Sequence, residues 1–238
     1  MTKGQRQDFF REIRKSWTRF VSILFIVLLG VAFFAGLRSA EGDMKRTADA
    51  YLDGQQFMDI RILSTLGLTE DDRQAIEAVR GVKRAEGIYS VDVLTDLEDT
   101  QKVLTIISVP EDIARLHVTD GRLPLKAGEC ILDDEFAASA GYHVGDTIRI
   151  YMEEGEVSDK LCTDEYEIVG LGKNPWYLTF DRGSATIGNG SLSGFMAIQK
   201  VDFVQDIYTQ IYVVVEDAAE YSCYEDAYLD LIDEMQER

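Results

Sequence analysis

Residues 20–37 have the sequence FVSILFIVLLGVAFFAGL, eighteen consecutive residues without a charged side chain. A helix of this length covers about 27 Å, which is close to the roughly 30 Å hydrocarbon core of a lipid bilayer. Ser22 is the one polar residue of the stretch, and a serine hydroxyl can donate to the backbone of its own helix. The stretch therefore predicts a transmembrane helix over residues 20–37.

A cleaved signal peptide is the alternative explanation, because it also combines a basic start with an apolar stretch, usually of about 7 to 15 residues. The best small-x-small cleavage site, Gly30-Val31-Ala32, lies inside the apolar stretch. A cut after Ala40 would place the charged Arg38 three residues before the cut, and no Leu-x-x-Cys lipobox follows. We therefore expect the helix to remain as a membrane anchor.

The charges on the two sides of the stretch have opposite signs. Residues 1–19 contain six basic and two acidic residues, a net charge of +4. Residues 38–238 contain 18 basic and 41 acidic residues, a net charge of −23. Because basic residues that flank a span stay in the cytoplasm, we expect a cytoplasmic N-terminus and an extracytoplasmic region 38–238 at the cell membrane.

Before the span, apolar and basic residues separate onto two sides at helical spacing. The apolar side occupies about 100° of arc and comprises Phe9, Phe10, Ile13, Trp17 and Phe20. The opposite side carries Arg11, Lys15 and Arg19. This pattern predicts a basic amphipathic helix over residues 1–19 that lies on the inner membrane surface. The alternative is a basic stop sequence with incidental aromatic residues.

The composition of the region after the span limits the classes of partner that it can bind. Its 201 residues are enough for one large domain or two small ones, and 46% hydrophobic residues in the chain predict a folded protein. The strong negative charge argues against nucleic acid or an anionic lipid surface as a partner. Acidic clusters at residues 70–72 and 133–135 lack the spacing of a calcium loop, so a solvated acidic surface is the simplest interpretation.

Three cysteines, Cys130, Cys162 and Cys223, are too few and too scattered for a disulfide framework. Their odd number leaves at least one unpaired within the chain, while one disulfide between two of them stays open. Cys130 lies in an apolar context, where a buried thiol that behaves as a small hydrophobic side chain is expected. A site that uses a reactive thiol is not favoured.

Strand and helix patterns alternate after the span, which predicts an α+β domain. Predicted strands are residues 58–63, 82–97 with a bend at Gly87, 103–109, 130–132, 148–152, 166–171, 195–198 and 207–215. Predicted helices are residues 69–81, opened by a capping box at Thr69, residues 133–140, closed by Gly141, and residues 218–237. Strands 148–152 and 166–171 are expected to pair in antiparallel fashion and to contribute to a small β subdomain.

The last predicted helix carries a short heptad-like seam, because Tyr221, Tyr224, Tyr228, Leu231 and Met235 follow each other at spacings of three and four. A helix that faces the core of the domain and a stalk or coiled coil both fit this seam. Two heptads are too few to choose between them.

Motifs for catalysis, nucleotides or metals are not found in the sequence. Residues 170–174 (GLGKN) resemble the end of a phosphate-binding loop, but Glu167 and Asn174 occupy the positions that require glycine and Ser or Thr. No cysteine has the context of a cysteine transpeptidase, and His117 and His143 with three separated cysteines make a poor zinc site. We therefore expect a protein that is not an enzyme and has no cofactor.

Four glycine-containing motifs follow the span in a fixed order: GRLP at residues 121–124, GECIL at 128–132, GYHVGDTI at 141–148 and YEIVG at 166–170. With the basic amphipathic start and the single span, this series resembles the FtsX-like/MacB-like ABC transporter permeases. The resemblance is to their first transmembrane helix plus the MacB-like periplasmic core domain, and it covers essentially the whole chain. The opening of the chain and residues 58–69 (MDIRILSTLGLT) are similar to the large Gram-positive members.

The resemblance implies a fold and a mode of action. Residues 38–238 would form a mixed α/β extracytoplasmic MacB-like core domain, built from segments on either side of a small β-rich subdomain at about residues 121–172. A separate cytoplasmic ABC ATPase subunit would drive this domain mechanically through the first helix, and residues 1–19 would act as a coupling helix. Cargo in such systems includes peptides, antibiotics and lipid-linked proteins, and some members instead regulate cell-wall hydrolases.

Family permeases carry further spans after the core domain. We therefore expect this chain to be the N-terminal portion of a longer permease, which further spans or a second permease copy would complete. The alternative is a single-pass membrane-anchored binding or adaptor module that recruits an extracytoplasmic partner and regulates a cell-envelope enzyme. A thiol enzyme is a third hypothesis, which the cysteine contexts do not favour.

Overall fold

The computed structural model describes residues 17–97, 100–177 and 182–238. The chain divides into two compact units, Met1–Ala48 and Asp49–Arg238. The larger unit holds two β-sheets, and the strands and helices predicted after the span fall within it.

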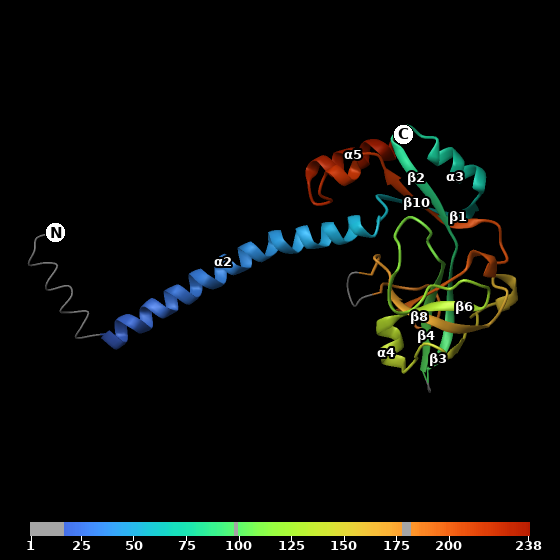
Figure 1. The fold of residues 1–238 in the computed structure, drawn as a ribbon, viewed down its shortest axis with the longest axis horizontal. Helices are drawn as coiled ribbons and strands as arrows, with labels where there is room; N and C mark the ends of the chain where they lie inside the picture. The colour runs from blue at the N-terminus through green and yellow to red at the C-terminus, as the bar shows by residue number, and fades with distance from the viewer. Residues whose placement is uncertain (1–16, 98–99, 178–181) are drawn as a thin grey trace, which may run out of the picture. The chain divides into compact units, whose positions relative to one another are not determined.

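The first described element, α2 (Trp17–Gly54), is one uninterrupted helix of 38 residues (Figure 1). Its large apolar side chains over residues 20–37 are exposed, as with Leu29, which is 73% exposed. Among the described residues it is the one helix that is long and apolar enough to cross a membrane. The helix continues without a break through the polar residues that follow the apolar stretch, as far as Gly54.

A three-stranded antiparallel sheet forms one part of the larger unit. β10 (Tyr208–Val215) lies in its centre, between β1 (Ile60–Leu68) and β2 (Val82–Ile88). Two helices, α3 (Glu70–Glu77) and α5 (Asp226–Gln236), cover one face of this sheet (Figure 1). The other face contributes Ile88 and Tyr212 to a core shared with the second sheet.

The start of α3 confirms the predicted capping box. The Thr69 hydroxyl accepts the N–H of Asp72 at 3.2 Å, and the Asp72 carboxylate accepts the N–H of Thr69 at 2.7 Å. The helix ends at Glu77, earlier than the predicted Gly81. Gly81 has φ +99° and lies in the turn that leads into β2, so it marks the start of the next strand and not the end of the helix.

The second sheet is mixed and has seven strands. Six of them follow the order β3 (Ser90–Leu97), β4 (Thr100–Ser108), β9 (Leu192–Ile198), β6 (Glu129–Asp133), β8 (Glu165–Lys173) and β5 (His117–Gly121). The seventh, β7 (Thr147–Arg149), pairs with β8 in antiparallel fashion, as predicted. α4 (Asp134–Ala140) is capped by the Asp133 carboxylate and closed by Gly141 in the left-handed conformation, which confirms that helix.

Residues 82–97 form two strands and not the one bent strand that we predicted. β2 pairs with β10 through Ile88, whereas β3 pairs with β4 from Ser90 onward. The single residue between them, Tyr89, donates its N–H to the Ser108 hydroxyl, and its carbonyl accepts the N–H of Ser108. The chain therefore changes sheets at Tyr89, because its hydrogen-bond partner changes there.

Residues 121–172, for which we predict a small β-rich subdomain, supply β6, β7 and β8 to a larger sheet. β6 pairs with β9 as well as with β8, and β9 pairs with β4. The continuous sheet therefore spans residues 90–198, and strands from both sides of the predicted subdomain extend it.

The C-terminal helix is shorter than predicted. Residues 218–237 hold a short 3-10 turn, η3 (Ala218–Glu220), followed by α5 from Asp226. Between them the Cys223 N–H donates to the Asp49 carboxylate at 2.9 Å, a bond that a continuous helix would direct to its own backbone. Tyr221 and Tyr224 therefore lie outside the helix, and the predicted seam does not form.

The part of the seam that is helical faces the core of the domain. Ile232 and Met235 are buried, and Tyr228 and Leu231 pack against the same apolar cluster on the three-stranded sheet. Of the two interpretations left open by the sequence, the core-facing helix is confirmed.

The ordered glycine motifs are explained by close contacts within the second sheet. Gly121 has φ +71°, and a Cβ atom there would lie 2.3 Å from the Val169 carbonyl oxygen. A Cβ atom on its strand partner Gly170 would lie 2.2 Å from the Arg122 carbonyl oxygen. Both positions therefore require glycine for β5 to approach β8.

Arg122 and Glu129, from the first two motifs, form a two-pronged ion pair next to this contact. The two guanidinium nitrogens lie 2.7 and 2.6 Å from the two carboxylate oxygens, and the Leu125 N–H donates to Glu129 at 2.9 Å. The Glu129 side chain is 3% exposed. Arg122 and this backbone N–H lower the pKa of Glu129 to about 2.

This pKa predicts an acid-sensitive contribution to folding. Since the folded pKa of about 2 lies below the value of about 4.3 expected in the unfolded chain, the contribution is present above pH 4.3 and is lost as pH falls toward 2. We expect the urea midpoint of Glu129→Gln, followed by tryptophan fluorescence, to be lower than wild type at pH 7 and to fall less between pH 5 and pH 2. Glu154→Gln, at an exposed side chain, is the matched control and should follow wild type. Parallel curves for all three proteins would contradict the assignment.

Candidate functional site

The membrane-surface residues predicted from the sequence are described only in part. Phe9, Phe10 and Ile13 lie outside the described residues. Trp17 and Phe20 lie in the first turns of α2, where they are 61% and 40% exposed. Their ring centroids are 6.4 Å apart, so these two aromatic side chains share one face of the helix, as the helical spacing predicts.

The stronger candidate site lies where the end of α2 meets the three-stranded sheet, within residues 49–238. The linker between α2 and β1 is held on several sides by backbone hydrogen bonds. Gln56 accepts the N–H of Ala114 at 2.8 Å, and the Asp59 N–H donates to Val213 at 2.9 Å. Met58, between them, is 6% exposed and belongs to the core shared by both sheets. The end of α2 is therefore followed by a linker that is hydrogen-bonded to Ala114 and to β10 and is partly buried in the core.

Aromatic side chains add a second attachment to this linker. The Phe57 ring stacks on Trp176, with centroids 6.0 Å apart. The Arg61 guanidinium lies 4.2 Å from the centroid of the Trp176 ring, a cation–π arrangement. Trp176 thereby joins the linker to the segment that follows β8.

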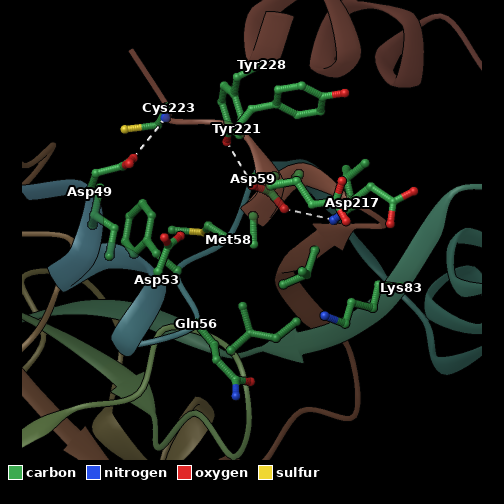
Figure 2. A pocket seen from close by; sticks show the side chains of 18 of the residues that line it. Asp49, Asp53, Gln56, Met58, Asp59, Lys83, Asp217, Tyr221, Cys223 and Tyr228 are labelled. Atoms are coloured by element: carbon green, nitrogen blue, oxygen red, sulfur yellow. Dashed lines mark hydrogen bonds between the residues drawn. The ribbon is translucent and has the colours of Figure 1, made fainter. Parts of the chain in front are cut away.

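Asp59 is the most connected side chain of the junction. One carboxylate oxygen accepts the Val215 N–H at the end of β10, and the other accepts the Tyr228 hydroxyl of α5, both at 2.8 Å. Burial raises the pKa of Asp59, and the nearby Asp53 charge acts in the same direction, while these two donors and Lys83 partly offset the shift. Figure 2 shows Asp59 at the centre of the group.

A second carboxylate ties α2 itself to the C-terminal segment. Asp49, one turn before Asp53 on α2, accepts the Cys223 N–H at 2.9 Å. Burial raises the pKa of the Cys223 thiol to about 11, and the charge of Asp49 adds to that shift. We call these three hydrogen bonds, from Cys223 to Asp49 and from Val215 and Tyr228 to Asp59, the junction latch.

A cleft of about 700 Å³ opens beside the junction latch (Figure 2). Its walls come from the end of α2, the linker, the start of β2, the end of β10 and the segment that runs into α5. Five carboxylates line it: Asp49, Asp53, Asp59, Asp217 and Glu220. The two basic lining residues are Lys83 and Arg84, and Arg84 already pairs with Asp112 at 2.8 Å.

The cysteines do not form a reactive group. All three are free thiols, so the disulfide that the sequence left open is not formed. Cys130 is fully buried, which raises the pKa of its thiol and confirms the expected role as a small apolar side chain. Within the described ranges, no three His, Cys, Asp or Glu side chains gather in a group that could hold a metal ion.

Sequence reasoning missed this junction, because its residues come from segments more than 150 positions apart. The local signal was the spacing of Asp49 and Asp53, which places two carboxylates on one face of α2, one turn apart. Nothing in the sequence pairs them with residues 215–228.

Comparison with known proteins identifies the family. The family model for the MacB-like periplasmic core domain matches residues 21–226. The extracellular domain of the noncanonic ABC-type transporter YknZ from Gram-positive bacteria is 15% identical, with a TM-score of 0.42 over 73% of this chain and 87% of that chain. The periplasmic region of MacB from Actinobacillus actinomycetemcomitans is 12% identical, with a TM-score of 0.38 over 74% and 77%.

No curated protein matches the chain. The family match nevertheless covers most of the 238 residues, including the apolar stretch of α2 from Val21 onward and the whole of both sheets. It also agrees with the resemblance that the ordered glycine motifs indicate. The chain therefore belongs to the MacB-like periplasmic core domain family, the domain that ABC-type transporter permeases carry.

Proposed function

We propose that this chain couples a cytoplasmic ABC ATPase subunit to an extracytoplasmic domain by mechanical transmission, in the export or extraction of a substrate. The N-terminus lies in the cytoplasm and residues 38–238 lie outside, as the net charges of +4 and −23 on the two sides of the span favour. Further permease spans or a second permease copy complete the transport unit, and the cargo is an extracytoplasmic molecule or protein.

The observation that carries the proposal is the continuity of α2. Every residue from Trp17 to Gly54 is helical, and the chain enters β1 through a linker that is hydrogen-bonded to both sides. A helix resists compression and bending, because each turn is bonded to the next. A displacement at the membrane can therefore reach the junction latch without being absorbed in a loop.

The proposal does not assign catalysis to the chain. Burial raises the pKa of the Cys130 and Cys223 thiols, which works against thiolate formation at neutral pH. His117 and His143 are both exposed, and the nearest acidic partner of His143 is Asp146 at 3.7 Å on the surface. These features do not favour the thiol-enzyme hypothesis.

A single-pass binding or adaptor module that regulates a cell-envelope enzyme is the second candidate. The cleft of about 700 Å³ favours it, because a chain that only transmits motion has no need of a ligand-sized cavity. Recovery of an ATPase subunit with the intact protein from membranes supports transmission, and recovery of an envelope enzyme alone supports the adaptor.

A break in α2 should uncouple the two sides of the membrane. Met44 is exposed on α2 beyond the apolar stretch, and proline there removes a backbone hydrogen bond and kinks the helix. With the permease and its ATPase in nanodiscs, we expect ATP and vanadate to change amide hydrogen exchange in residues 49–59 and 215–228. Met44→Pro should abolish this change and Met44→Ala should retain it. An unaltered response in Met44→Pro would contradict transmission through α2.

The apolar side of residues 1–19 should also be needed for coupling. Phe10→Asp, Ile13→Asp and Trp17→Asp together place three charges on the side expected to contact the membrane. We expect this triple variant to lose the same ATP-dependent exchange response. A variant with Thr2→Asp, Gln5→Asp and Gln7→Asp adds the same charge at polar positions and should respond like wild type. Normal coupling in the first variant would refute the coupling helix.

The junction latch should contribute measurably to folding. Asp59→Ala leaves the Tyr228 hydroxyl and the Val215 N–H without their acceptor, which costs about 1–3 kcal/mol when such groups are buried. We expect the free energy of unfolding in urea to fall by about this amount. Asp230→Ala, at an exposed position of α5, should change it by less than about 0.5 kcal/mol. Equal effects of the two substitutions would show that the latch does not hold the junction.

A further inference from the structure

We propose that the end of α2 is held by a clamp with two states, which we call the α2 clamp. In the closed state, the one that the structure shows, the loop of residues 111–115 donates hydrogen bonds to the turn that ends α2. In the open state these bonds are broken and α2 continues through residues 55–57. The use of this change in transmission rests on the proposed function, whereas the clamp itself is a property of residues 49–238.

The turn that ends α2 is a Schellman motif, a helix end closed by two backbone hydrogen bonds. The Phe57 N–H donates to the Leu52 carbonyl, and the Gln56 N–H donates to the Asp53 carbonyl, both at 3.0 Å. The motif requires a left-handed residue at the position of Gln56, which has φ +50°. Glycine is the usual residue there, because a side chain raises the energy of the left-handed conformation. The turn is therefore strained at Gln56.

A glycine is available two positions earlier and is not used for this purpose. Gly54 is the last residue of α2, and its φ is not positive. If local preference alone ended the helix, Gly54 would be the left-handed residue and α2 would stop earlier. A strained backbone conformation persists where the surrounding structure imposes it. The position of the turn therefore depends on contacts from another part of the chain.

The loop that follows β4 supplies these contacts. The Ala114 N–H donates to the Gln56 carbonyl at 2.8 Å, and the Arg115 N–H donates to the Gln55 carbonyl at 3.1 Å. Ala114 has φ +55° and is 2% exposed, so both residues joined by the shorter bond are left-handed. Among the non-glycine residues that the structure describes, one other has a positive φ, Asp217. Aspartate adopts this conformation more readily than glutamine or alanine.

One side chain of β2 holds the loop in turn. The Glu86 carboxylate accepts the N–H groups of Glu111, Asp112 and Ile113 at 2.7, 3.1 and 2.9 Å. Glu86 is 8% exposed, so these bonds replace the water that its charge lacks. Five consecutive backbone N–H groups of the loop therefore have acceptors, three on Glu86 and two at the end of α2. The loop connects α2 to the three-stranded sheet through its backbone.

The open state exchanges the hydrogen bonds of the turn for helical ones. In a continuous α-helix the Gln56 N–H donates to Leu52 and the Phe57 N–H donates to Asp53, so both donors keep an acceptor. Gln56 then has the right-handed conformation and its strain is released. The loss consists of the two bonds from the loop and the stack of Phe57 on Trp176. Because strain relief opposes these losses, the open state lies within reach of the closed one.

The test measures amide hydrogen exchange of the full chain in nanodiscs without nucleotide, read at single residues by mass spectrometry with electron-transfer fragmentation. In low concentrations of urea, we expect the Ala114 and Arg115 amides to exchange by local opening, with little dependence on urea. The amides of the central strand β10 should exchange only through global unfolding, with a strong dependence on urea. Phe57 should stay protected while Ala114 exchanges, since its N–H has an acceptor in both states.

Substitutions at the left-handed position should shift the two states in opposite directions. Gln56→Gly removes the strain of the closed state and should slow exchange at Ala114 and Arg115 by about five- to thirtyfold. Gln55→Gly is the matched control, because it makes the same change at the neighbouring residue, whose φ is not positive, and it should not slow exchange. Gln56→Val should speed exchange there, since a β-branched residue avoids positive φ. Protection of β10 establishes that each variant is folded.

Three results would overturn the two-state clamp: exchange at Ala114 with the urea dependence of β10, no slowing in Gln56→Gly, or equal slowing in Gln55→Gly. Exchange of Phe57 together with Ala114 would show that the linker unfolds and that α2 does not lengthen, which also contradicts the proposal. These measurements need no ATPase. An intact clamp with no response to ATP would refute transmission alone, and a missing clamp would leave the Met44→Pro test of transmission unaffected.

Discussion

The hydrogen bonds of the Asp59 carboxylate hold the beginning and the end of the larger unit, residues 49–238, together. Asp59 lies in the short linker after α2 and accepts donors from the end of β10 and from α5, which are about 155 to 170 positions later in the chain. A buried carboxylate is tolerated only where donors replace its lost hydration. The same bonds that satisfy Asp59 therefore join the linker after α2 to the end of β10 and to α5.

The family motifs have a different physical role. Gly121 and Gly170 allow β5 to approach β8, and the ion pair of Arg122 with Glu129 closes the turn beside them. Gly145 continues this pattern, since its N–H donates to the Ile168 carbonyl at 2.7 Å and brings the chain into β7. These residues build the seven-stranded sheet. The features available for function lie at the junction, outside the motifs that identify the family.

Sequence reasoning succeeded where the determining contacts are local. The apolar stretch in α2, the capping box at Thr69 and the left-handed Gly141 depend on residues within a few positions of each other. It failed where the structure depends on a partner far away in the sequence. Tyr89, where the chain passes from one sheet to the other, is hydrogen-bonded to Ser108. The Cys223 N–H donates to Asp49, and the chain is not helical there. β5 was missed altogether, because its five residues are mostly exposed and are held by pairing with β8.

The negative charge of the domain is explained by the surroundings of its carboxylates. A net charge of −23 over residues 38–238 is explained by solubility as long as each carboxylate is solvated or paired, as in the group of Arg73 with Glu70 and Glu77. The junction follows the same rule, because Asp53, Asp217 and Glu220 are exposed to water, whereas the half-buried Asp59 has two hydrogen-bond donors and the nearby Lys83 charge.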